Sequence, residues 1–424
     1  SQTGYYSATL EENLGSGTDP GKFIVRVSHE KNGESVTMLN STLMHPGDNF
    51  NARIAKVEAG ESIRIASDKD DASNWAVGFK PMIVEETAKA YATQYLEDLR
   101  AQNINTEDYT TETATAYTTA KTALEEAIAD GATATEDDIT AKIEALEAAV
   151  ADLKEKPKFT SMSITLGGKI GVNFYTNMTD ATDVTVEFKR NNDVENGVVV
   201  YRCEVSAKEM TDMISATLTD AEGNTATATQ SVSDYANTLL NDANSSENLK
   251  ALVKAMLNYG AAAQTKFAYR TDSLANAALG ETDKVVSPIG EQLNEKCTGH
   301  GVNDVEGYKG FSLVLKSETD MKLYFNEDMK ESISAVSTAD ATKVIQADEK
   351  LNNTFCSLTI ADVPVNHLGD TYTVKVGNTT VGTVCPLTYC WKVASNSSAY
   401  TEELNNLVNA LYAYYQAAEA YTPQ

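Results

Sequence analysis

The chain has 424 residues and a formal net charge of -27, from 61 acidic and 34 basic residues spread along the sequence without a block of like charge. Because a single hydrophobic core stops growing near about 250–300 residues, several folded units are expected. The lack of clustered lysine and arginine argues against a nucleic-acid partner, and the acidic balance is typical of a soluble protein outside the cell.

No stretch approaches the roughly 20 apolar residues that a membrane-spanning helix needs, so no membrane span is predicted. The sequence begins SQTGYYSATL, which we interpret as a mature chain whose export signal has been removed. The five cysteines are an odd number without a CxxC pair, and the four histidines stand apart. Neither a disulfide scaffold nor a zinc site is therefore predicted, and we expect mostly buried thiols with at most one or two bridges.

Residues 1–82 alternate short apolar runs with turn residues, which predicts a small antiparallel β-sandwich. The runs are KFIVRVS, SVTML, NARIAKV, ESIRIAS and WAVGFK, separated by KNGE, HPGD and EAGE. In the last run Trp75 shares one strand face with Val77 and Phe79. Trp75 is therefore either a core residue or a residue that faces a ligand.

Two loops carry the oxygen ligands that calcium prefers. SDKDDASN contains Asp68, Asp70 and Asp71, which are candidate ligands of a structural calcium ion. The alternative is a solvated turn, and no other cofactor is expected. TDAEGN, with Asp220 and Glu222, is better explained as a hairpin turn with glycine at its tip.

Residues 83–156 change to a helical period and predict a three-helix bundle. The three amphipathic runs are VEETAKAYATQYLEDLRAQ, TTETATAYTTAKTALEEAIAD and TEDDITAKIEALEAAVADL. The second and third runs, from DYTTETATAY to EALEAAVADL, resemble the FIVAR-type helical repeats of Gram-positive surface proteins. This resemblance implies an exported, multi-module surface protein in which the bundle is a spacer. Pro157 ends the unit, because proline cannot continue a helix.

Residues 157–280 and 281–424 are predicted to form two α+β lobes related by internal duplication. SVSDYANTLL and LKALVKAMLNYGAAAQTKFAY in the first lobe match CPLTYCWKVA and LNNLVNALYAYYQAAEAY in the second, and the strands KIGVNFY and DMKLYFN also correspond. Each lobe should contain several strands, a short helix and a long helix with a core-facing apolar stripe. Two such lobes side by side would leave a groove along their junction.

Aromatic residues present in only one copy of the repeat are the candidate ligand-binding residues. Trp391 occupies the place of Asn237 on the polar face of the short helix, where the shared scaffold needs no large ring. Asn237 on that face is also predicted to bind the ligand. A ligand-facing indole, a plug between the lobes and an inward-facing strand residue are the three interpretations of Trp391. The same comparison selects three further aromatic residues that have no aromatic counterpart in the other copy. Tyr324 aligns with Asn173, Tyr175 with Asn326, and Tyr415 with Gly260.

Flat rings combined with amide and hydroxyl groups suit pyranose sugars, and an acidic protein favours a neutral glycan. LVKAMLNYGAAAQTKFAYRTDSLAN, SVSDYANTLL and LVNALYAYYQAAEAY resemble a bilobed module of secreted proteins of gut Firmicutes, similar to the starch-adherence-system proteins that ruminococci assemble into amylosomes. Over residues 158–424 this resemblance implies a non-catalytic groove for α-1,4-glucan, the polysaccharide of starch, between two lobes. It also implies a companion starch-binding unit in residues 1–155. The expected location is extracellular, either secreted or attached to the cell surface. Other proteins of a surface complex are the expected partners, and they would be contacted through segments outside this sequence.

Catalysis is not expected, because GxSxG, HExxH and P-loop motifs are absent from the sequence. A glycoside hydrolase needs two carboxylates across a cleft, and the acidic composition neither reveals nor excludes such a pair. The alternative function is a host-protein-binding adhesin of the cell surface, with immunoglobulin or mucin as partner, since helical bundles and sandwiches also serve that role.

Overall fold

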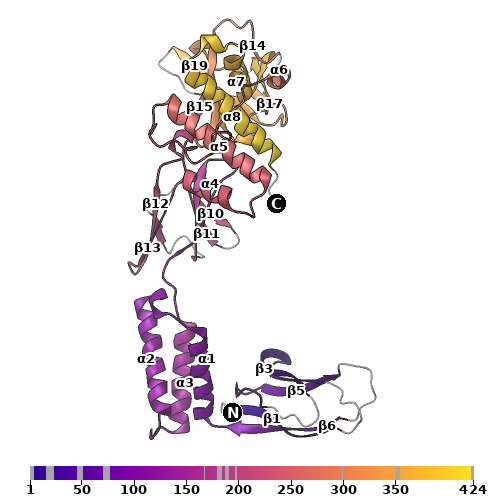
Figure 1. Cartoon of the computed structure of the whole chain (residues 1–424), viewed down its shortest axis with the longest axis vertical. Helices are drawn as coiled ribbons and strands as arrows, with labels where there is room; N and C mark the ends of the chain where they lie inside the picture. Colours follow the sequence, from indigo (N-terminus) through magenta and orange to yellow (C-terminus); the bar gives the residue numbers. More distant parts are fainter. Residues whose placement is uncertain are drawn as a thin grey trace. The chain divides into compact units, whose positions relative to one another are not determined.

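The computed structural model describes residues 4–15, 23–44, 51–69, 77–166, 168–178, 184–186, 191–195, 198–297, 299–348 and 354–421. The chain divides into two compact units, Ser1–Lys156 and Pro157–Gln424. Over the described residues they contain six small antiparallel sheets and eight α-helices (Figure 1). The protein is therefore multidomain and mixed α/β, and the boundary falls where Pro157 follows the helical segment.

The N-terminal unit contains two three-stranded antiparallel sheets. The first has the order β4-β1-β6, from Ala55–Val57, Gly4–Gly15 and Val77–Glu86. The second has the order β3-β2-β5, from Glu34–Met44, Phe23–Lys31 and Glu61–Lys69. Ala8 of β1 shares a small core with Val25 and Val27 of β2 and with Leu39 of β3, so apolar residues of both sheets pack together.

Three helices follow the strands: α1, α2 and α3, at Ala88–Gln102, Thr111–Ile128 and Glu136–Ala151. A 3-10 helix, η1 (Thr106–Asp108), connects the first two. Thr87 caps α1 by accepting a hydrogen bond from the Ala90 amide, and Thr135 forms a capping box with Asp138 at the start of α3. The first helix starts later than the sequence predicts, because residues 84–86 continue strand β6.

The C-terminal unit begins with a four-stranded and a three-stranded sheet. The first has the order β10-β11-β8-β7, from Asn191–Glu195, Val198–Glu204, Gly171–Thr176 and Phe159–Ile164. The second has the order β13-β12-β9, from Thr225–Gln230, Ile214–Asp220 and Val184–Val186, with the 3-10 helix η3 (Ala207–Glu209) before β12. The helices α4 and α5 complete this half at Val232–Asn241 and Glu247–Lys266.

The rest of the unit opens with helix α6 (Glu291–Cys297) and continues with two further sheets and two helices. A three-stranded sheet has the order β15-β16-β19, from Tyr308–Leu315, Thr319–Asn326 and Phe355–Val363. A five-stranded sheet has the order β14-β21-β20-β17-β18, from Gly301–Val302, Thr379–Val384, Tyr372–Val376, Ile333–Ser337 and Val344–Gln346. Helices α7 and α8 follow at Pro386–Ala394 and Glu402–Ala420, and the 3-10 helices η4, η5 and η6 cover Glu327–Met329, Val365–His367 and Ser397–Ala399.

Local periodicity in the sequence correctly predicted the helices α4 and α7 and the alternation of buried and less buried side chains along β16. SVSDYANTLL and PLTYCWKVA are helical, with Pro386 at the first helical position, where its missing N–H is not needed. Along β16, Met321, Leu323 and Phe325 are fully buried while Tyr324 is half-buried, because successive side chains point to opposite faces of a strand.

The two halves of the C-terminal unit share one core. Helices α5 and α8 pack against each other, and the rings of Tyr259 and Tyr414, both buried, lie 5.8 Å apart. At another point the Ile170 amide donates to the Ser317 carbonyl at 3.0 Å, and Lys169 forms an ion pair with Glu318 at 3.5 Å. The halves therefore form one folded unit rather than two independent ones.

Tyr415 belongs to this core, which corrects its assignment as a ligand-binding residue. It is only 2% exposed, and its hydroxyl accepts a hydrogen bond from Lys296 at 3.1 Å. A Cβ added to Gly369 would lie 2.7 Å from that hydroxyl, so the glycine leaves room for the ring. At the corresponding position of the first half, a Cβ on Gly260 would lie 2.6 Å from the Met210 sulfur. The ring is present in one half only because internal packing differs there.

We predict that Tyr415→Ala lowers the free energy of unfolding by about 3–5 kcal/mol, the usual cost of removing a buried aromatic ring. Chemical denaturation measures this difference. Tyr324→Ala is the matched control: it removes a half-buried tyrosine, and we expect a loss of roughly 1–2 kcal/mol. Equal losses for the two variants would contradict the core assignment of Tyr415.

Candidate functional site

The predicted aromatic residues of the C-terminal unit lie on separate elements. Trp391 is on α7, half-buried, and packs against the shared core. Asn237 is half-buried on α4. Tyr175 on β8 shares a hydrogen bond with Ser163 at 3.2 Å, and Tyr324 on β16 shares one with Ser312 at 2.9 Å. The ligand-facing role of these four residues stays a prediction.

Four further predicted residues fall wholly or partly outside the described part of the chain. Trp75, Asp70 and Asp71 lie outside the described residues, and Asp68 is in strand β5 with its side chain outside them. Four hollows in the described part of the chain are lined by residues other than the predicted aromatic ones.

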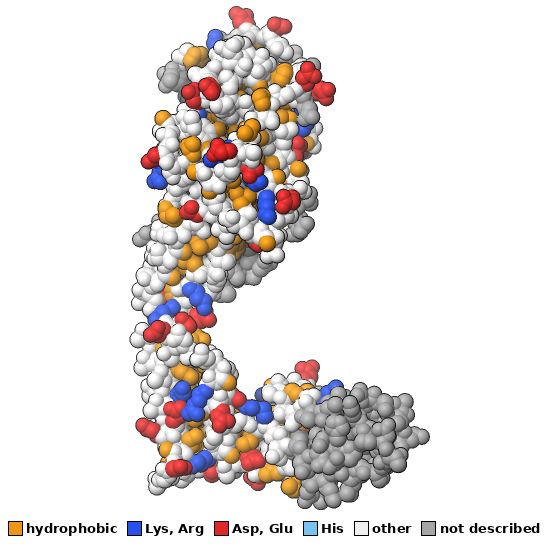
Figure 2. Space-filling view, in the orientation of Figure 1, with side chains coloured by type: hydrophobic (Ala, Val, Ile, Leu, Met, Phe, Trp, Pro, Cys, Tyr) orange, Lys and Arg blue, Asp and Glu red, His pale blue; other side chains and the backbone are white. Residues whose placement is uncertain are grey.

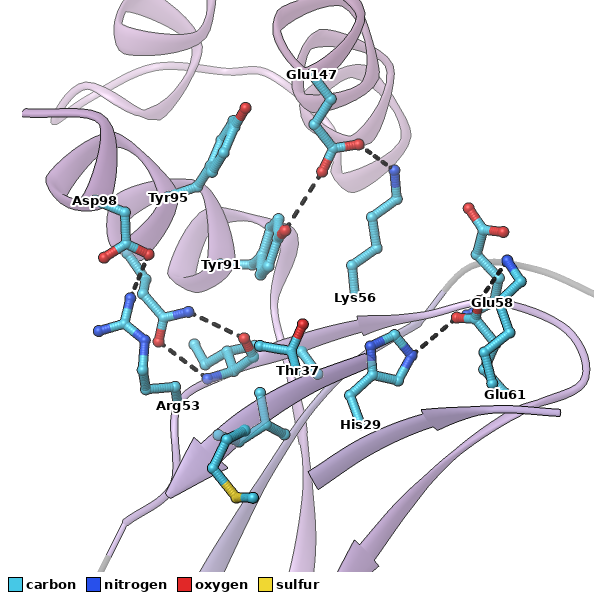
Figure 3. Close-up of a pocket in the computed structure, with 16 residues that line it drawn as sticks. His29, Thr37, Arg53, Lys56, Glu58, Glu61, Tyr91, Tyr95, Asp98 and Glu147 are labelled. Atoms are coloured by element: carbon cyan, nitrogen blue, oxygen red, sulfur yellow. Dashed lines mark hydrogen bonds and ion pairs between the residues drawn. The ribbon is translucent and has the colours of Figure 1, made fainter. Parts of the chain in front are cut away.

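A hollow of about 370 Å³ in the N-terminal unit, here called the tyrosine pocket, combines rings with polar groups. Figure 3 shows the helices contributing Tyr91, Tyr95 and Glu147 on one side and the strands contributing His29 and Thr37 on the other. Its charged and amide lining residues are His29, Lys31, Arg53, Lys56, Glu58, Glu61, Gln94, Asp98 and Glu147.

Two tyrosines one helical turn apart on α1 form the aromatic side of the tyrosine pocket. The rings of Tyr91 and Tyr95 are 6.1 Å apart and nearly parallel, with an interplanar angle of 10°. Tyr5 from β1 stacks on Tyr91 at 4.9 Å, and the Tyr91 hydroxyl donates to Glu147 at 3.3 Å. Burial raises the pKa of Tyr91 and raises the pKa of Tyr95 to about 12. Both phenols are therefore neutral near pH 7.

Charged side chains of the tyrosine pocket are paired with one another. Lys56 donates to Glu147 at 2.6 Å, and Arg53 forms an ion pair with Asp98. Gln94 bonds both the amide and the carbonyl of Ile54 at 3.0 Å, which fixes its orientation. The lining contains three permanent cations, Lys31, Arg53 and Lys56, and four carboxylates, Glu58, Glu61, Asp98 and Glu147, so their charges nearly balance.

Glu61 is the most strongly held carboxylate of the tyrosine pocket. Its oxygens accept from the Glu58 amide at 2.9 Å and contact Lys31 and His29, each at 2.9 Å. The Glu58 amide, followed by Lys31 and His29, lowers the pKa of Glu61 from 4.5 to about 2. Glu61 is therefore ionised at every physiological pH and has no proton to donate as a general acid.

A second hollow follows the helix pair of the C-terminal unit and is here called the interhelical groove. Two adjoining depressions of about 300 and 460 Å³ share Asn258 and Val286. Most polar residues that line the two depressions are amides, namely Asn258, Asn276, Asn406, Asn409 and Gln416. Tyr412 is the aromatic residue of the lining. The groove lies between α5 and α8.

Comparisons with known proteins leave the site to be interpreted from its own chemistry. No protein-family model, no curated protein and no solved structure matches the chain. Among the described residues, no helix is both long and apolar enough to cross a membrane. Figure 2 shows acidic and basic side chains interspersed on the visible face of each unit.

Sequence reasoning missed the tyrosine pocket because it treated the helices as a spacer. Tyr91, Tyr95, Gln94 and Asp98 recur at spacings of three and four residues, which places them on neighbouring parts of one helix surface. This spacing is a local pattern, so the shared helix surface could have been predicted from the sequence. The strands that meet this surface carry His29 and Lys56, whose approach no local pattern reveals.

We predict that Glu61 stabilises the folded chain above pH 4.5 and that this contribution is lost as the pH falls toward about 2. The sign follows from the lowered pKa, because the unfolded state binds the proton first. Scanning calorimetry of Glu61→Gln should show a lower unfolding temperature than wild type at neutral pH and a difference that shrinks through this range. Glu58→Gln is the control, since it keeps the backbone amide that Glu61 accepts from. A pH-independent difference for Glu61→Gln would contradict the assignment.

Proposed function

We propose that the protein binds a neutral α-glucan of the starch type without catalysis, and that the tyrosine pocket is its principal binding site. The observation that carries this proposal is the pair of nearly parallel tyrosine rings beside a charge-balanced polar rim. A sugar ring stacks its C–H face on an aromatic ring while its hydroxyls bond to amides, carboxylates and ammonium groups.

Charge balance in the tyrosine pocket favours a neutral ligand. Lys56 and Arg53 are each paired with a carboxylate of the pocket, and the whole chain is strongly acidic. An anionic polymer would have to displace these carboxylates and would be repelled by the protein as a whole. A neutral glycan can bond to the paired groups without separating them.

The same contacts support a binding role over hydrolysis. A glycoside hydrolase needs a protonated carboxylic acid beside the scissile bond, and Glu61 is held ionised. Glu147 and Asp98 bond to Lys56 and Arg53. Glu147 and Asp98 are thus engaged in ion pairs within the pocket.

We propose a finer architecture for the two units as well. In the N-terminal unit the two sheets make a β-sandwich and α1–α3 a bundle. In the C-terminal unit the sheets of the two halves have matching strand orders. The order β11-β8-β7 corresponds to β19-β16-β15, and β13-β12-β9 corresponds to β21-β20-β17. This correspondence supports two lobes related by duplication. The interhelical groove then lies at their junction and offers a second glucan site. Trp391, Tyr324, Tyr175 and Asn237 do not line this groove and are separate candidates for glucan contacts on the C-terminal unit.

The location that goes with this function is extracellular, as a secreted or surface-attached protein. Starch is a polymer outside the bacterial cell, so a starch-binding protein must be exported to meet it. Association with other proteins of a surface complex, as in an amylosome, is part of the same proposal.

A protein-binding adhesin is the second candidate function, and one surface favours it. Val36 and Met38 on strand β3 are 57% and 49% exposed, at the edge of the β3-β2-β5 sheet. Exposed apolar side chains on an edge strand are typical of surfaces that receive another chain.

We predict that the full chain is retarded by amylopectin in affinity electrophoresis and that Tyr95→Ala weakens binding at least tenfold, on the order of 1.4 kcal/mol. Calorimetry with maltooligosaccharides measures the same loss. Tyr95→Phe is the matched control, because it keeps the stacking ring and should bind within a factor of about two of wild type.

Trp391→Ala in the same assays separates the two units. A loss with Tyr95→Ala alone places the principal site in the tyrosine pocket. A loss with Trp391→Ala alone moves the site to the C-terminal unit and overturns the assignment to the tyrosine pocket. Unchanged migration of the wild type on starch overturns the glucan proposal altogether.

A further inference from the structure

Three potential metal ligands that are distant in sequence converge in the C-terminal unit. They are Cys297 at the end of α6, His300 just before β14, and Cys385 at the N-cap of α7. One ligand atom from each lies within 4.8 Å of the other two, and the Cys385 sulfur is 3.9 Å from Nδ1 of His300. The cluster is separate from both the tyrosine pocket and the interhelical groove.

Burial of the cluster distinguishes it from an accidental surface grouping. Cys297 is 3% exposed and Cys385 is 2% exposed, while His300 is half-buried. Both thiols are free. Two buried sulfur ligands with one imidazole at the solvent side leave one direction from which an ion can enter.

The spacing is close to that of a tetrahedral zinc site. Zinc bonds of about 2.3 Å to sulfur and about 2.0–2.1 Å to nitrogen place neighbouring ligand atoms roughly 3.5–3.8 Å apart. The observed separations exceed this by about 1 Å or less, which side-chain rotation can supply. Thiolate and imidazole together select zinc over calcium and magnesium, which take oxygen ligands.

Cys385 also stands where the fold would ordinarily have a different residue. In the matching position of the first half, Ser231 caps α4 by accepting from the Asp234 amide. Serine is a preferred N-cap, whereas cysteine is not. In the second half Thr388 accepts from the Cys385 amide at 3.1 Å and lies 3.5 Å from its sulfur. Cys385 is thus held at the N-terminus of α7, a helix of nine residues, beside the other two ligands.

We propose that Cys297, His300 and Cys385 form a zinc site, with a fourth position open to water. Bound zinc would link the end of α6 and the start of β14 to the start of α7, which follows directly after β21, the strand that pairs with β14. The two thiols release their protons to solvent as the ion binds. The site is structural in this proposal, since one ion would connect segments of the second half that are distant in sequence.

Metal analysis of the purified full chain tests the proposal. Reduced protein that has been exposed to zinc and desalted should retain about one zinc per chain, as expected for one tetrahedral site. Cobalt in place of zinc should give the intense thiolate-to-cobalt absorption that oxygen ligands do not give. A chelator should remove the ion and lower the unfolding temperature.

Variants separate ligation from folding. Cys385→Ser and His300→Gln should lose the cobalt absorption and the retained zinc, and the half-buried position of His300 lets its variant fold. Cys356→Ser is the matched control, since Cys356 is a buried thiol on β19 outside the cluster and its variant should keep the metal.

Two results would overturn the zinc site. One is reduced, folded protein that retains no zinc and gives no cobalt absorption. The other is a Cys297–Cys385 disulfide, found by peptide mapping without reduction, in a protein that binds no metal after reduction. A disulfide does not involve His300, so an effect of His300→Gln on metal retention supports ligation alone.

Discussion

Small antiparallel sheets need their apolar faces covered, and this constraint governs both units. A sheet of three or four strands has too little core of its own to be stable in water. In the C-terminal unit the buried faces of β8 and β16 enter the same core as α5 and α8. In the N-terminal unit Tyr5 of strand β1 enters the core of the helices α1–α3. The helices are thus parts of the cores of both units.

The tyrosine pocket is a consequence of that covering in the N-terminal unit. Tyr5 stacks on Tyr91 and brings α1 against the strands, while Lys56 reaches Glu147 on α3. The neighbouring polar side chains pair across the remaining gap, so their orientations are set before any ligand arrives. Pre-set donors and acceptors reduce the ordering cost of binding.

Local features were predictable from the sequence, and contacts between distant segments were not. Helical periodicity located α4, α5, α7 and α8, and the alternation of β16 followed from its apolar residues. The interpretation of Tyr415 was wrong because it assumed that both halves pack alike. Gly369 makes room for this ring in one half, whereas Met210 fills the equivalent space beside Gly260 in the other. A sequence comparison shows that two positions differ, but it does not show which neighbours changed with them.

The same reasoning separates Tyr415 from Cys385, although both are differences between the two halves. The ring of Tyr415 is explained by its neighbours, since Gly369 and Lys296 accommodate its edge and its hydroxyl. Cys385 stands where Ser231, a preferred helix cap, stands in the first half, and it is buried at the edge of the shared core. Its nearest polar partners are Thr388, His300 and, through the cluster, Cys297. Cys385 is a less favourable N-cap than serine, and it lies beside a second thiol and an imidazole. Metal coordination explains this residue better than a contribution to stability does. Divergence between the halves therefore indicates chemistry only where the surrounding residues fail to account for it.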